Sequence, residues 1–121
     1  MNNLLLVFIG GGLGSLARFG IGAFVQYNFK SVFPIATLCS NIFSCLILAI
    51  TVAVFSEKLI TNPGLRMLIL IGFCGGFSTF STFSAETVEL MRTGNLTIAI
   101  ANILISVAVC VTLIYFITKQ A

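Results

Sequence analysis

Histidine, tryptophan and aspartate are absent from the 121-residue sequence, and glutamate occurs only three times. Without histidine or aspartate the chain cannot assemble the usual general base or metal cluster of an enzyme. Charged residues make up 7% of the chain, whereas soluble domains carry roughly 25%. The six lysines and arginines are also scattered rather than clustered, which excludes a nucleic-acid footprint. These absences indicate that the protein is neither an enzyme nor a soluble or nucleic-acid-binding domain.

Apolar residues fill most of the chain, at 59% of the sequence with a mean hydropathy of +1.17. A helix needs about 20 apolar residues to cross a bilayer, and four segments qualify, at about 4–27, 34–56, 65–91 and 96–118. The short connections between them make neighbouring helices antiparallel. The sequence therefore predicts an all-α, multi-pass protein of the cell (inner or plasma) membrane, with residues 1–121 forming one transmembrane domain.

The four cysteines, at positions 39, 45, 74 and 110, all lie in the apolar segments. None forms a C-x-x-C pair, and no histidine is available to complete a zinc site. Free cysteine behaves as a small hydrophobic residue in most proteins. We therefore interpret these cysteines as packing residues.

Cationic residues are divided almost equally between the two sides of the predicted bundle. Lys58, Arg66 and Lys119 lie on one side, and Lys30 and Arg92 on the other. Membrane proteins orient themselves by an excess of Lys and Arg in their cytoplasmic loops, and here there is almost none. The balance predicts that the chain inserts in both orientations, so that two inverted copies form a dual-topology, antiparallel homodimer.

The segment Gly72 to Glu86, GFCGGFSTFSTFSAE, combines glycines, hydroxyl residues and a carboxylate within an apolar span. Irregular polar sequence at membrane depth occurs where it is buried in protein or lines a polar cavity. Gly75-Gly76 is typical of a helix C-terminus in the left-handed conformation, and Ser78 or Thr79 is typical of an N-cap. The pattern predicts a broken third helix, with carbonyl groups that favour a cation and N–H groups that favour an anion.

After the predicted break the side chains divide into two faces. Phe80 and Phe83 share one face, and Ser78, Thr82 and Glu86 share another. An aromatic stripe is usually core, but the positive edge of a phenylalanine ring can also face an anion. Glu86 is expected near a mouth of a pathway, where a carboxylate is tolerated.

Two polar residues outside this segment are further candidates. Asn41 lies on one face of the second span with Thr37 and Ser44, and its amide offers two N–H donors to an anion. Arg18 lies deep in the first span, after the small-residue pair Gly10 and Gly14. An arginine at this depth either snorkels to the interface or faces a wet vestibule that attracts anions, and the sequence leaves both alternatives open.

The chain resembles the Fluc (CrcB) family of small fluoride channels over its whole length. The similar segments are GGGLGSLARF in the first span, FPIATLCSN in the second and GFCGGFSTFSTFSAE in the third. The resemblance implies a dual-topology antiparallel dimer with two fluoride pathways and a structural Na⁺ at its centre. It also implies that main-chain oxygens of Gly75 and Ser78 hold the sodium, although Ser78 stands where the family commonly has threonine. The pore residues implied are Asn41, Phe80 and Phe83.

The resulting prediction is a fluoride-selective channel that exports cytoplasmic fluoride passively and so lowers its toxicity. The hydroxyl groups of Ser81, Thr82 and Ser84 are further donors inferred from helix geometry, with Arg18 and Glu86 in a vestibule. One alternative is a dual-topology, proton-coupled small multidrug exporter, which needs a carboxylate in the middle of a span. Glu86 is the only candidate for that role, so this alternative is disfavoured. A structural membrane subunit without transport is a third possibility.

Overall fold

The computed structural model describes residues 2–119, which are helical apart from short connections. Its elements are α1 (Asn3–Asn28), α2 (Ile35–Thr61), α3 (Pro63–Arg66), the π-helical segment η1 (Met67–Cys74), α4 (Gly75–Phe77), α5 (Phe80–Arg92) and α6 (Leu96–Lys119). The elements from α3 to α5 succeed one another along the single span Pro63–Arg92. This span and the helices α1, α2 and α6 are each long and apolar enough to cross a membrane. The prediction of a four-span, multi-pass membrane protein is confirmed.

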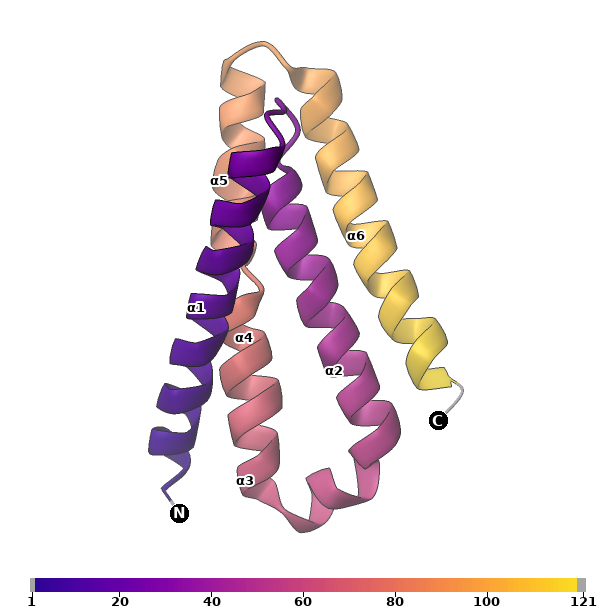
Figure 1. Ribbon diagram of the computed structural model, residues 1–121. Helices are drawn as coiled ribbons and strands as arrows, with labels where there is room; N and C mark the ends of the chain where they lie inside the picture. The colour runs from indigo at the N-terminus through magenta and orange to yellow at the C-terminus, as the bar shows by residue number, and fades with distance from the viewer. Residues whose placement is uncertain (1, 120–121) are drawn as a thin grey trace.

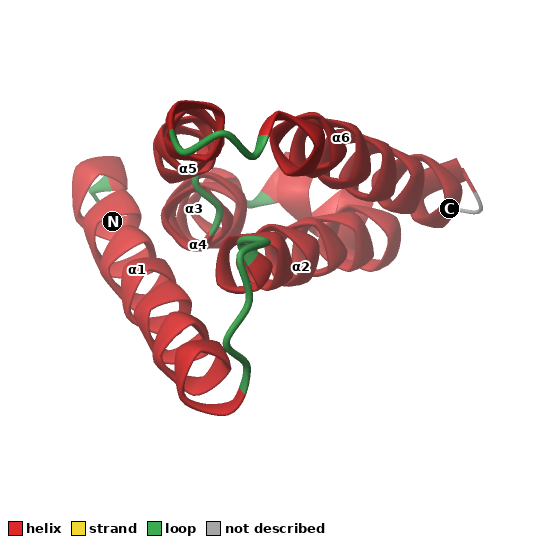
Figure 2. Cartoon of the chain, turned by 90° about the horizontal axis from the view of Figure 1, so that it is seen from above, coloured by secondary structure: helices red, strands yellow, loops and turns green. Residues whose placement is uncertain are grey.

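The third span lies at the centre of the bundle. Figure 1 places the start of α1, the junction of α2 and α3, and the end of α6 together at one end of the molecule. The connection from α1 to α2 and the turn from α5 to α6 lie at the opposite end. Helix α1 packs against η1 and α4, α2 packs along α6, and α5 also contacts α6 (Figure 2). Helix α2 also contacts η1 and α4, so each of the other spans contacts some part of the third.

Helix α2 continues beyond residue 56, where the apolar pattern predicted its end. Phe55 has a non-helical backbone conformation (φ −113°, ψ 25°), which kinks the helix. Beyond the kink Leu59 is buried, and the Thr61 hydroxyl donates to the Glu57 carbonyl at 3.1 Å. The burial of Leu59 stabilises the extra turn, so most of the expected connection is helical. The side chain of Asn62 then caps α3.

Glycines bring α1 and the third span into backbone contact. Gly10 and Gly14 are both buried, and a Cβ added at Gly14 would lie 2.8 Å from the Phe77 nitrogen. From the opposite side, a Cβ at Gly76 would lie 3.1 Å from the Cα of Gly11. A Cβ at 2.8 Å is closer than real Cβ atoms approach, and at Gly76 it would also overlap the Gly11 carbonyl oxygen, so only glycine permits the approach at these two positions. The packing interpretation of the Gly10–Gly14 ridge is confirmed, and its partner is the segment that precedes the helix break.

The segment η1 is wound as a π-helix over its eight residues, Met67–Cys74. Its turns are wider than those of an α-helix, because each hydrogen bond spans one more residue. Gly72 in this segment faces α1, where a Cβ would lie 3.0 Å from the Cα of Gly10. The π-helical segment is therefore part of the surface through which the third span packs against α1.

Candidate functional site

Two extended residues interrupt the third span. Helix α4 ends at Phe77, and α5 begins at Phe80. Between them Ser78 (φ −79°, ψ 158°) and Thr79 (φ −150°, ψ 118°) have extended conformations. The Thr79 hydroxyl oxygen accepts a hydrogen bond from the Thr82 N–H at 3.1 Å, which caps α5. Of the two residues that the sequence offered as the cap, the structure selects Thr79.

The glycines before the break do not act as a left-handed helix end. Gly75 is right-handed helical (φ −64°, ψ −36°), and Gly94 is the one glycine with positive φ among residues 2–119. The prediction of a left-handed cap at Gly75-Gly76 is therefore wrong. Gly76 is required instead because the backbone of Gly11 leaves no room for a Cβ. The helix ends by becoming extended at Ser78.

The break changes the hydrogen bonds of the carbonyl groups in and just before it, among them those of Gly75 and Ser78. In a continuous helix the Thr79 N–H would donate to the Gly75 carbonyl, and the Thr82 N–H to the Ser78 carbonyl. Here the Thr79 N–H donates to Asn41 Oδ1 at 2.9 Å, and the Thr82 N–H donates to the Thr79 hydroxyl oxygen. The carbonyls of Gly75 and Ser78 thus lose the donors of a regular helix. Such oxygens need another partner when they are buried.

Side chains supply donors to the two carbonyls on either side of Gly75. The Cys74 carbonyl accepts from the hydroxyls of Ser44 at 3.0 Å and Ser78 at 2.9 Å. The Gly76 carbonyl accepts from Arg18 Nε at 3.3 Å. The fold therefore supplies donors to the carbonyls of Cys74 and Gly76, whereas those of Gly75, Phe77 and Ser78 lack their helical donors. Gly75 and Ser78 are the two that the family resemblance implies to be cation ligands.

A cavity of about 300 Å³, which we call the break cavity, opens between α2, the break, α5 and α6. Its lining comprises Asn41, Cys45, Ser78, Thr79, Phe80, Phe83, Ser106, Val107, Cys110 and Val111. Because the Asn41 oxygen accepts from the Thr79 N–H, the two N–H donors of the amide remain for other partners. The rings of Phe80 and Phe83 lie 5.9 Å apart between centroids. The three predicted pore residues therefore share one cavity.

A second cavity of about 290 Å³, the arginine cavity, lies on the other side of Thr79. Arg18, Glu86 and Thr82 all line it, and Thr79 lines both cavities. Arg18 is half-buried and bonded to the Gly76 carbonyl. Of the two alternatives for Arg18, the geometry supports a side chain that faces a cavity within the protein.

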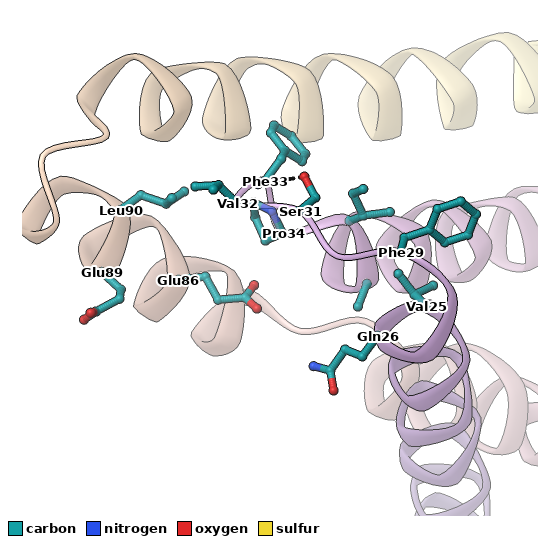
Figure 3. A pocket seen from close by; sticks show the side chains of 12 residues that line it. Val25, Gln26, Phe29, Ser31, Val32, Phe33, Pro34, Glu86, Glu89 and Leu90 are labelled. Carbon is teal, nitrogen blue, oxygen red and sulfur yellow. Dashed lines mark hydrogen bonds between the residues drawn. The ribbon is translucent and has the colours of Figure 1, made fainter.

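A third cavity of about 270 Å³, the loop cavity, lies between the end of α1, the connection to α2, and α5 (Figure 3). Glu86 lines both this cavity and the arginine cavity. In Figure 3 its carboxylate points toward Gln26, whereas that of Glu89 points away. Glu86 Oε1 is buried and accepts no hydrogen bond from the described residues. The carboxylate thus lies where the two cavities meet.

The predicted hydroxyl donors are not all in these cavities. Thr82 lines the arginine cavity, but Ser81 is exposed and Ser84 half-buried, and neither lines any of the three cavities. The structure adds Ser106 and Cys110 of α6 to the break cavity. Their spacing of four residues put them on one helix face, but the sequence did not reveal which helix that face contacts.

A buried polar network connects α6 to the backbone of Phe83. Asn102, which is 1% exposed, donates to the Thr87 hydroxyl oxygen at 3.0 Å and accepts from the Ser106 hydroxyl at 3.2 Å. The Thr87 hydroxyl in turn donates to the Phe83 carbonyl at 2.8 Å. Asn102 therefore holds α5 and α6 together beside the break cavity.

Replacing Asn102 with alanine is expected to destabilise the protein by about 1–3 kcal/mol, because buried partners lose their hydrogen bonds. Thermal unfolding in detergent measures the effect. Asn28→Ala is the matched control, because Asn28 is exposed and bonds only the Phe24 carbonyl of its own helix. Equal midpoints for Asn102→Ala and the wild type would contradict a stabilising role for the network.

Fold and site together define the class of protein: a small four-span membrane protein whose central span is interrupted beside cavities that carry polar side chains, as in proteins that transport ions or solutes. The chain matches the family described as CrcB-like protein, Camphor Resistance (CrcB), over residues 5–117. It therefore belongs to the CrcB family, as the resemblance of its motifs predicted.

Relatives with established names cover most of the chain. A protein named Fluoride-specific ion channel FluC 1, from Yersinia pseudotuberculosis serotype I (strain IP32953), is 45% identical over 108 residues, covering 88% of this chain and 84% of the relative. Fluoride-specific ion channel FluC from Coxiella burnetii (strain CbuK_Q154) is 43% identical over 110 residues, or 90% and 89% of the two chains. The protein of that name from Solibacter usitatus (strain Ellin6076) is 36% identical over 112 residues, or 93% and 92%.

Proposed function

We propose that this protein is a fluoride-selective channel of the plasma membrane, through which cytoplasmic fluoride leaves passively down its electrochemical gradient. The relatives that carry this name cover most of the chain. Within the structure, the hydrogen bond from the Thr79 N–H to Asn41 Oδ1 carries the proposal, because it turns the amide donors of Asn41 toward other partners. The family match disfavours the multidrug exporter as an alternative and accords with a protein that is not an enzyme.

The pathway that we propose follows the three cavities in order. Glu86 joins the loop cavity to the arginine cavity, and Thr79 joins the arginine cavity to the break cavity. A dehydrated anion needs donors in place of its water, and Arg18 and Thr82 supply them in the arginine cavity and Asn41 in the break cavity. Phenylalanine rings at the end of the series present positive edges to an anion and exclude bulk water.

Fluoride efflux from proteoliposomes tests the function directly. Liposomes loaded with fluoride are short-circuited with an ionophore, and a fluoride electrode follows the efflux, with chloride-loaded liposomes as the selectivity control. Rapid fluoride efflux without comparable chloride efflux is expected. Absence of fluoride efflux would falsify the channel proposal, and proton-driven transport of a hydrophobic cation in its place would establish the exporter.

Replacing either phenylalanine of the break cavity with isoleucine is expected to lower fluoride efflux at least tenfold, because the ring edge is lost while apolar bulk remains. Phe83 is 9% exposed and Phe80 is 79% exposed, so Phe83→Ile tests a packed ring and Phe80→Ile an accessible one. Phe8→Ile is the control, since Phe8 is 77% exposed and lines none of the three cavities. Wild-type efflux in both cavity variants would remove these rings from the pathway.

We further propose that a structural Na⁺ is held at the break by the main-chain oxygens of Gly75 and Ser78. These two carbonyls lose their helical donors, and oxygen ligands suit a hard cation. Among residues 2–119 no group of three or more His, Cys, Asp or Glu side chains could hold a metal ion. A sodium site in this region must therefore use carbonyl or hydroxyl oxygens.

Exchanging Na⁺ for a large organic cation such as N-methyl-D-glucamine is expected to lower both thermal stability and fluoride efflux. A large cation cannot fill a site of main-chain oxygens, so the carbonyls at the break would be left without a partner. Thermal unfolding in matched chloride salts measures the effect on stability. Potassium is the control for ion size. Identical unfolding midpoints and efflux in all three salts would count against a sodium site.

The assembly that we propose is a dual-topology, antiparallel homodimer. The ends of the bundle carry Lys58, Arg66 and Lys119 against Lys30 and Arg92, a nearly even division that gives little preference for either orientation. Reporters fused to the C-terminus, one active in each compartment, would both give signal. A one-sided result would exclude dual topology, and cross-linking in membranes tests the dimer separately.

A further inference from the structure

Two cysteines from different helices meet in the break cavity. Cys45 of α2 and Cys110 of α6 both line it. Each lies one helical turn after another residue of the lining, Cys45 after Asn41 and Cys110 after Ser106, so each pair shares one face of its helix. Helices α2 and α6 pack along one another, as Figures 1 and 2 show. The fold therefore directs both cysteines into the same space.

Cys45 is the titratable neighbour of the Cys110 thiol, and both side chains line the same cavity. Both residues are half-buried, so the sulfur atoms are covered without being sealed inside the bundle. The other two cysteines do not line this cavity: Cys39 lines none of the three cavities, and Cys74, a neighbour of Cys45, is buried on η1. Packing alone, which the sequence suggested for all four cysteines, does not describe this pair.

We propose that Cys45 and Cys110 form a two-thiolate site for a soft metal cation that accepts linear coordination. Thiolate ligands select soft cations. A tetrahedral zinc site needs four ligands, and residues 2–119 offer no group of even three suitable side chains. On binding, each thiol releases its proton to water and each sulfur donates an electron pair to the metal. Two protons leave for each cation bound, and nothing is oxidised or reduced.

Occupancy of this site obstructs the break cavity. The metal would lie in the cavity that Asn41 and Phe83 also line, beside the donors proposed to receive fluoride. A thiophilic cation would therefore stop fluoride efflux. This consequence rests on the proposed function, whereas binding of the metal does not.

Retention of mercuric ion by the purified protein tests the binding step. The protein is equilibrated with mercuric chloride and washed with a monothiol, and retained mercury is counted by elemental mass spectrometry. One retained mercury per chain is expected for the wild type and for the control Cys39→Ser, with loss of retention in Cys45→Ser and Cys110→Ser. Undiminished retention in both of these variants would overturn the site.

Methylmercury gives a second test that needs no substitution. It has one open coordination position and binds a single thiol, so the monothiol wash should remove it while mercuric ion stays bound. Equal retention of the two mercurials by the wild type would overturn the two-thiolate site even if a cysteine variant did not fold.

Efflux measurements test the consequence for transport. Mercuric chloride is expected to reduce fluoride efflux more than tenfold in the wild type and Cys39→Ser, and to have little effect in Cys45→Ser and Cys110→Ser. Retained mercury with undiminished efflux would overturn the obstruction. Retained mercury in a protein that shows no fluoride efflux before treatment would leave the metal site intact and overturn the proposed function.

Discussion

Replacing Asn41 with aspartate is expected to reduce fluoride efflux about 100-fold, which corresponds to about 2.7 kcal/mol. The substitution keeps a side-chain oxygen that can accept from the Thr79 N–H, which in the wild type lies 2.9 Å from Asn41 Oδ1. It removes the two amide donors and places a negative charge beside the proposed path of an anion. Like charges brought together cost several kcal/mol. The variant therefore tests the N–H donors of Asn41 separately from its oxygen, which accepts the hydrogen bond from Thr79.

Efflux from proteoliposomes and thermal unfolding in detergent are measured on the same preparations of this variant. Asn3→Asp is the control, because it introduces the same charge at an exposed position at the start of α1. Retained stability with much reduced efflux is the expected result for Asn41→Asp. Wild-type efflux through a stable Asn41→Asp protein would contradict the assignment of Asn41 to the pathway.

Replacing Gly14 with alanine is expected to destabilise the protein by about 3 kcal/mol or more, at the upper end of the cost of overpacking. The new Cβ would overlap the Phe73 carbonyl oxygen and lie 2.8 Å from the Phe77 nitrogen. Both atoms belong to the backbone, so no side-chain rotation relieves the clash. Helix α1 would have to move away from η1 and α4, and the position of the break would shift with them.

The yield of monodisperse protein in detergent and its unfolding midpoint report this effect. Gly12→Ala is a matched control on the same helix, since a Cβ at Gly12 meets nothing within 4 Å. Its expected effect is stabilising or neutral, because alanine is favoured over glycine in helices by about 1 kcal/mol. Equal losses in Gly12→Ala and Gly14→Ala would contradict the assignment of Gly14 to the close contact.

Local patterns predicted the spans and the region of the break, because apolar run length and capping chemistry are properties of neighbouring residues. Thr79 illustrates this: its cap on α5 involves only Thr82, three residues later. The conformation of Gly75-Gly76 was not predictable in this way. The need for glycine at position 76 comes from Gly11, more than sixty residues earlier in the chain.

The candidate site shows the same division between local and distant information. Asn41 was identified from helix periodicity and its donor groups, but its hydrogen bond to Thr79 required the fold. The sequence left two alternatives open for Arg18, and the hydrogen bond from Arg18 Nε to the Gly76 carbonyl distinguishes them. The sequence placed Cys110 on one face of its helix, but only the fold shows that this face lies beside α2. The prediction of the site was therefore incomplete because contacts between distant segments cannot be read from the sequence.

The π-helical winding of Met67–Cys74 determines how the length of this segment can change. Loss of one residue would allow the segment to rewind as an α-helix, because a π-helical turn holds one more residue in each hydrogen-bonded ring. An α-helix turns by about 100° per residue and a π-helix by less, so the shorter α-helical segment would cover nearly the same rotation. Gly76 would then still face Gly11, and the break would keep its position. A regular α-helical span has no such reserve, because loss of one residue there rotates every later position by about 100°.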